Sequence, residues 1–130
     1  MIIYTVMFII AVYLNLKDTR ALLMALVVGL SYFFPFELIS SRDAWYTACA
    51  LSELIVFSFC VWLRSKSSFA IAGLCLMLLA SHFISYHDIQ LHVYSFVAKY
   101  LEYVQILSCI LLSHPILNYM KERIKCQSKL

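Results

Sequence analysis

The stretch TACALSELIVFSFCVWL, residues 47–63, decides the fold class, because Glu53 is its single charged residue. An apolar run of this length is close to the roughly 20 residues that a helix needs to cross the hydrocarbon core of a bilayer. We therefore predict a membrane-spanning helix here. The carboxylate of Glu53 is then out of place, because an ionisable group within a bilayer is costly and needs protein or water around it.

The composition of the whole chain agrees with a membrane environment. Of its 130 residues 64% are hydrophobic and only 13% are charged. Soluble domains are nearer to half apolar and a quarter charged. A domain this small has too little interior to bury so much apolar surface. We therefore expect a single membrane domain whose partner is the lipid bilayer.

Short charged stretches divide the rest of the chain into further apolar segments. Residues 2–16 would extend only about 23 Å as a helix, so they span only with local thinning or with one end at the interface. Pro115 interrupts the last apolar segment and predicts a kink. The predicted fold is an all-α, polytopic integral membrane bundle of four to five transmembrane helices with short loops. Its spans are about 2–16, 21–39, 47–63, 69–86 and 89–113, followed by a basic amphipathic tail, 114–130.

The basic residues predict the orientation. With five spans, the short loops of one side carry only Arg42. The other side receives Lys17, Arg20, Arg64, Lys66, Lys121, Arg123, Lys125 and Lys129. Because cytoplasmic loops are enriched in Lys and Arg, we expect a cytoplasmic C-terminus and an outside N-terminus, in a plasma or inner membrane. The net charge of +3 is spread over these breaks rather than over one face, so no nucleic-acid partner is expected.

Four ionisable residues inside the predicted spans form a candidate intramembrane polar cluster: Glu53, His82, Lys99 and Glu102. On the last helix, Lys99 and Glu102 are spaced i,i+3 and can form an ion pair. They belong to a polar face that also includes His92, Ser95, Cys109 and Ser113, opposite an apolar face. Two interpretations remain open: a bundle interface in which buried charges neutralise each other, or an ion or proton path open to the outer side.

The segment SHFISYHDIQLH, residues 81–92, gathers three histidines and an aspartate. Histidines five residues apart are rotated by about 140° on a helix, so no two of them share a face. The i,i+4 spacing of helical zinc sites is absent. We therefore predict no metal site, and interpret His87, Asp88 and His92 as an outer-side polar turn in which Asp88 caps the following helix.

No motif predicts catalysis. The chain has no glycine-rich phosphate loop, no G-x-S-x-G and no C-x-x-C, and no catalytic residue or cofactor is expected. The leading hypothesis is a small non-enzymatic membrane protein that acts through helix–helix contacts. It would serve as an accessory subunit or modulator, of the immunity or exclusion type, of a larger membrane assembly. The alternative is a self-assembling ion or proton pathway, or a holin-like, membrane-permeabilising pore subunit. In either case other membrane subunits, different or identical, are the expected partners.

Overall fold

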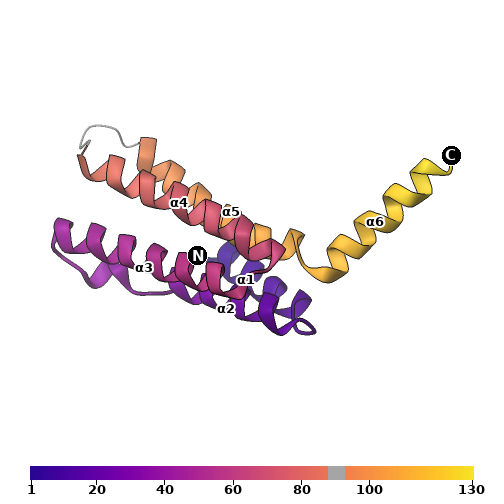
Figure 1. Ribbon diagram of the computed structural model, residues 1–130. Coiled ribbons are helices and arrows are strands. Elements are labelled where there is room, and N and C mark those ends of the chain that lie inside the picture. Colours follow the sequence, from indigo (N-terminus) through magenta and orange to yellow (C-terminus); the bar gives the residue numbers. More distant parts are fainter. Residues whose placement is uncertain (88–92) are drawn as a thin grey trace.

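A computed structural model describes residues 1–87 and 93–130. Helices joined by short turns make up the described part, which contains no strand. Its elements are α1 (Ile2–Leu14), α2 (Thr19–Tyr32), the short 3₁₀ helix η1 (Phe36–Leu38), α3 (Arg42–Leu63), α4 (Lys66–His87), α5 (Val93–Leu111) and α6 (His114–Ser128). Helices α1 to α5 form an elongated bundle, and α6 projects from one end of it (Figure 1).

Three helical segments of the described chain are long and apolar enough to cross a membrane: Thr19–Leu38, Arg42–Leu63 and Ser68–His87. A fourth span results if the bent pair of α5 and α6 is one span. The predicted four to five spans therefore become three to four. The difference arises at α1, which has 13 residues and extends only about 20 Å, well short of a hydrocarbon core.

The predicted span 21–39 is not one continuous α-helix. Helix α2 ends at Tyr32, and the chain turns through Phe33 and Phe34 into η1. Pro35 is the physical reason, because its ring disfavours helical geometry at the residue before it and it offers no N–H. Helix α2 begins directly after Asp18, which is its N-cap. The Asp18 carboxylate accepts hydrogen bonds from the backbone N–H groups of Arg20 and Ala21.

The longest helices, α3 and α4, form an antiparallel hairpin and pack on each other more extensively than any other pair. Arg64, which joins them, adopts a left-handed backbone conformation with φ 49°. Helix α5 packs against α4 on one side and against α1 and α2 on the other. The α1–α2 turn, the α3–α4 turn and the α5–α6 junction therefore lie at the same end of the bundle (Figure 1).

Helix α1 is held by polar contacts as well as by apolar ones. Tyr4 stacks on Tyr32 with ring centroids 3.6 Å apart, and its hydroxyl donates to the Val28 carbonyl at 3.4 Å. At the other end of α1, the side-chain amide of Asn15, only 2% exposed, donates to the Ala11 and Cys109 carbonyls at 2.7 and 3.1 Å. These bonds attach the short first helix to both α2 and α5.

The kink predicted at Pro115 is confirmed. Helix α5 ends at Leu111, and α6 begins at His114 at an angle of 68° to it. Pro115 lies in the first turn of α6, where its missing N–H removes no helical hydrogen bond. The second half of α5 confirms the predicted separation of a polar face from an apolar face. Cys109 and Ser113, the latter just beyond the helix, are buried. Leu107 and Leu111, on the opposite face, are exposed.

Candidate functional site: a polar cavity between the helices

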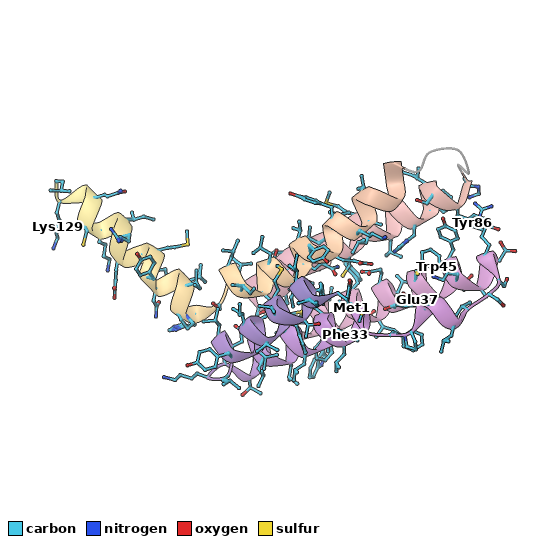
Figure 2. All side chains as sticks on the ribbon, turned by 180° about the vertical axis from the view of Figure 1, so that it is seen from behind. Met1, Phe33, Glu37, Trp45, Tyr86 and Lys129 are labelled. Carbon is cyan, nitrogen blue, oxygen red and sulfur yellow. The ribbon has the colours of Figure 1, made fainter. Side chains whose placement is uncertain are left out.

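A cavity of about 420 Å³ lies within the bundle, roughly halfway along its length. Figure 2 places Met1, Phe33 and Glu37 at this level, with Trp45 and Tyr86 further toward the end that is opposite α6. Side chains from α1 to α5 and from η1 line the cavity. The polar and aromatic ones are Tyr4, Ser31, Tyr32, Phe33, Phe34, Phe36, Glu37, Trp45, Tyr46, Cys49, Ser52, Glu53, His82, Ser85, Lys99, Glu102 and Gln105. All four residues of the predicted intramembrane cluster, Glu53, His82, Lys99 and Glu102, therefore border one space.

Glu53 is held in the wall of this cavity by a contact between three helices. Its side chain is 8% exposed, and its Oε2 atom accepts a hydrogen bond at 3.4 Å from Nε2 of Gln105 on α5. The same amide nitrogen lies 3.4 Å from the Cys75 sulfur on α4. Gln105 is only 4% exposed, so this amide satisfies the carboxylate away from bulk solvent.

Gln105 was not predicted as a site residue. It follows Glu102 by three positions and so continues the same face of α5, which is a signal that the sequence does contain. The buried polar side chains of Asn15 and Ser68 were not predicted either. Both lie beside short charged stretches that separate the apolar segments. A polar residue at such a place is equally typical of an exposed loop and of a buried hydrogen bond, so the sequence does not distinguish the two.

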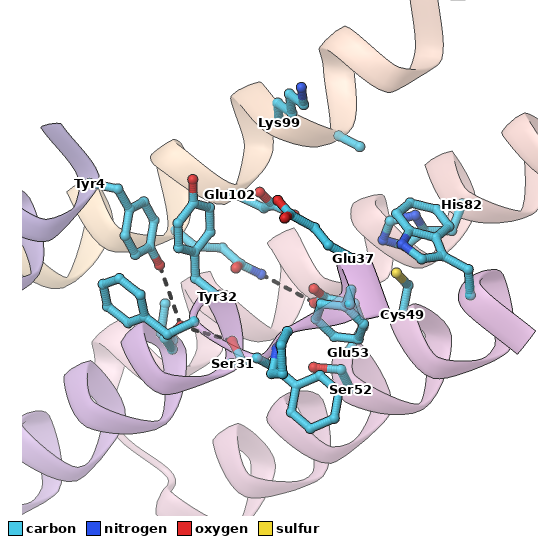
Figure 3. A pocket seen from close by; sticks show the side chains of 18 of the residues that line it. Tyr4, Ser31, Tyr32, Glu37, Cys49, Ser52, Glu53, His82, Lys99 and Glu102 are labelled. Atoms are coloured by element: carbon cyan, nitrogen blue, oxygen red, sulfur yellow. Dashed lines mark hydrogen bonds between the residues drawn. The ribbon is translucent and has the colours of Figure 1, made fainter. Parts of the chain in front are cut away.

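His82 lies on α4, facing α3. Its side chain is 8% exposed, and the indole of Trp45 meets its ring edge-to-face at a centroid distance of 6.3 Å. No hydrogen bond to its ring nitrogens is present among the described residues. The imidazole borders the cavity near Cys49 (Figure 3). The buried imidazole thus borders the open space without a hydrogen-bond partner in the part of the chain that the structure describes.

Glu102 and Lys99 do not form the ion pair that their spacing allows. Within the described chain no carboxylate oxygen lies within 4.0 Å of the Lys99 ammonium. Lys99 is exposed and its side chain projects away from the cavity, whereas Glu102 is half-buried and faces it (Figure 3). The two residues are three positions apart, but the long and exposed lysine side chain keeps its ammonium away from the carboxylate.

The break in α2 brings a third carboxylate to the cavity. Residues 33–37 run past its opening after the helix ends, and Glu37 of η1 lines it together with Glu53 and Glu102. This placement depends on the irregular segment around Pro35. A continuous helix over 21–39 would not predict it.

The predicted outer-side turn is only partly described. His87 is the last residue of α4 and is exposed, with its ring 4.6 Å from that of Phe83. Asp88 and His92 lie outside the described residues. Arg42, at the start of α3, donates to the Tyr86 carbonyl at 2.6 Å and lies over the rings of Tyr46 and Tyr86, 5.7 and 5.3 Å from their centroids. These contacts join the N-terminal end of α3 to the C-terminal end of α4.

The basic tail is solvent-exposed. Lys121, Arg123, Lys125 and Lys129 all lie on α6 or directly after it, away from the cavity. Arg123 donates to the Tyr119 hydroxyl at 3.0 Å. The tail also carries Cys126, the one exposed cysteine of the five, all of which are free thiols. In the described part of the chain, no group of three or more His, Cys, Asp or Glu side chains is placed to hold a metal ion.

Comparison of the chain with models of known protein families, with characterised proteins and with solved structures found no match in any of the three. Function is therefore inferred from the geometry alone.

Proposed function

We propose that the chain is a non-enzymatic integral membrane protein that acts through helix–helix contacts, as an accessory subunit or modulator of a larger membrane assembly. One observation carries this. Only 22%, 28% and 39% of the residues in the three apolar windows are buried within the chain. Most of the remaining surface of these helices must therefore be covered by lipid or by another protein.

The exposed side chains on α3 and α4 support the same conclusion. They are large and apolar, and include Leu54, Ile55, Trp62, Phe69, Met77 and Phe83. In contrast, no side-chain nitrogen or oxygen that is fully sealed from solvent lacks a hydrogen bond in the described part, whereas the His82 ring borders the cavity. Apolar outside and polar inside is the distribution that a bilayer favours.

The placement of the basic residues supports an orientation with α6 in the cytoplasm. Lys17, Arg20 and Arg64 lie at the end of the bundle from which α6 departs, and Arg42 lies at the other end. If α5 follows the bilayer normal, the 68° bend directs α6 nearly along the membrane surface. There its apolar residues Ile116, Met120 and Ile124 can enter the interface while its lysines contact anionic headgroups.

Cys126 tests this orientation without any engineered label site. Because the other four cysteines are buried, a membrane-impermeant maleimide is expected to modify Cys126 alone. Labelling should occur in inverted vesicles and not in intact cells, and Cys126→Ser should abolish it. Labelling of intact cells would reverse the orientation, and release of the protein by carbonate extraction would exclude an integral membrane protein.

The accessory role is tested by the stoichiometry of the intact complex. After extraction in a mild detergent, native mass spectrometry should show the chain at a fixed ratio with a second membrane protein. A stable homomer would instead favour the second candidate, a self-assembling ion or proton pathway.

The cavity is the observation that favours this second candidate, because Glu53, Glu102 and His82 border one space between the helices. An ion pathway predicts that expression of the protein collapses the membrane potential, measured with a potential-sensitive dye. The double variant Glu53→Gln, Glu102→Gln should then lose the effect. An unchanged potential on expression of the native chain would argue against it.

A further inference from the structure

We infer that the cavity between the helices is a binding site for a protonated organic amine with an apolar body. This inference goes beyond the accessory role and does not depend on it. It is drawn from three properties of the cavity walls: their charge, their aromatic side chains and the unpartnered imidazole of His82.

The side chains around the cavity carry an excess of negative charge. Glu37, Glu53 and Glu102 contribute three carboxylates, and the basic groups of the described lining other than His82 are the Lys99 side chain and the α-amino group of Met1. The Lys99 side chain projects away from the space that the carboxylates face (Figure 3). Carboxylates that border one space repel one another, and a cation placed between them offsets that repulsion.

Aromatic rings form much of the remaining wall. Tyr4, Tyr32, Phe33 and Trp45 all line the cavity, and the first three pack on one another by stacked and edge-to-face contacts. The faces of such rings attract cations, and their surface favours an apolar body. A volume of about 420 Å³ lies within the range of small-molecule sites.

His82 specifies the kind of cation. Its side chain is more than nine-tenths buried, borders the cavity and has no hydrogen-bond partner among the described residues. A neutral imidazole always has one nitrogen that accepts a hydrogen bond. An ammonium group has N–H donors for this nitrogen and for a carboxylate at once. A metal ion fits less well, because the described residues contain no group of three suitable ligands.

A matched pair of ligands tests the inference directly. 2-Phenylethylammonium and propylbenzene have nearly the same shape but differ in charge. Of the two tryptophans, Trp45 lines the cavity and Trp62 is 70% exposed at the other end of α3. In full-length Trp62→Phe protein in detergent, the fluorescence of Trp45 should therefore change saturably with the amine. Propylbenzene should give no saturable change.

Neutral variants of the same shape identify the groups that hold the cation. Glu53→Gln and Glu102→Gln should each weaken binding of 2-phenylethylammonium by at least about tenfold, the loss of one charge-assisted contact. Glu122→Gln is the control, because Glu122 is exposed on α6, and it should bind as the parent does. Circular dichroism checks that each variant folds. If Glu53→Gln does not fold, Glu102→Gln decides, since its carboxylate is only half-buried.

Equal responses to the amine and to propylbenzene would overturn the inference, since they would show partition into an apolar space only. Unchanged affinity of the folded Glu→Gln variants would overturn it as well. The oligomeric state is measured separately, so failure of this binding test does not contradict the accessory role. Likewise, failure to find a second membrane protein does not contradict amine binding.

Discussion

The Gln105 amide on α5 lies 3.4 Å from the Glu53 carboxylate on α3, and the two residues are 52 positions apart in the sequence. Both side chains are more than nine-tenths buried. This contact joins two helices through the cavity wall and gives a charged group in an apolar run its partner. The partner is a neutral amide, so the carboxylate accepts a hydrogen bond but no opposite charge faces it.

Replacement of Gln105 by leucine should destabilise the bundle. The variant leaves the Glu53 carboxylate buried without its donor, and a buried polar group that loses its partner costs about 1–3 kcal/mol. Thermal unfolding in detergent measures the change. Ser108→Ala is the matched control on the same helix, because the Ser108 hydroxyl bonds only to the Val104 carbonyl one turn away. Equal destabilisation by both variants would show that the interhelix contact contributes nothing.

Asn15 should act as a cap for the end of α5. In a longer helix the Ser113 N–H would bond to the Cys109 carbonyl, but it bonds to the Ile110 carbonyl instead. The Asn15 amide takes its place at 3.1 Å. Asn15→Leu removes this donor, which should cost about 1 kcal/mol, as the loss of a helix cap usually does.

Hydrogen exchange measures the effect of Asn15→Leu residue by residue. Protection should fall in α1 and in the last turn of α5, because Asn15 joins them, and should stay unchanged in the α3–α4 hairpin. Asn118→Leu is the control, since Asn118 is exposed on α6 and bonds only to His114 on the same helix. Unchanged protection in α1 would mean that packing alone holds it.

Hydrophobicity and charge made the helical class and most helix positions predictable. Apolar runs interrupted by charged residues mark where helices end, and Asp18 and Pro115 mark the start of α2 and the bend before α6. The sequence was less informative where apolar residues continue past a break. Phe33, Phe34 and Phe36 extend the hydropathy of α2, although Pro35 has already ended the helix.

The cavity residues were predictable as individuals, not as a set with defined contacts. An ionisable residue in an apolar run is conspicuous, and Glu53, His82, Lys99 and Glu102 all line the cavity. Their partners depend on how three helices are rotated against one another, which periodicity within one helix does not give. Gln105 and Trp45 therefore became apparent only from the packing, and Glu37 from the chain's path after Pro35.

Arg42 should stabilise the end of the bundle that is opposite α6. Its guanidinium contacts the Tyr86 carbonyl and two tyrosine rings, so Arg42→Met should lose about 0.5–1 kcal/mol, the range of an exposed cation–π contact. Arg42→Lys keeps the charge but lacks the planar fork, and should retain part of the effect. Limited proteolysis near the α4 end reports the change. Equal cleavage of Arg42→Met and the native chain would show that the contacts of Arg42 with Tyr46 and Tyr86 do not stabilise this end of the bundle.

The two glycines of the chain provide a matched test of the packing of α1 against α2. A Cβ atom at Gly29 would overlap the Phe8 ring of α1, whereas one at Gly73 would meet nothing within 4 Å. Gly73→Ala should therefore be neutral or stabilise α4 by up to about 1 kcal/mol, the difference in helix propensity. Gly29→Ala should destabilise by about 1–3 kcal/mol, the usual cost of overpacking, because the ring also packs against Phe33 and has little room to move. Thermal unfolding of the two variants in the same detergent measures both effects. If Gly29→Ala were as stable as Gly73→Ala, α1 would not be packed on α2 through Phe8.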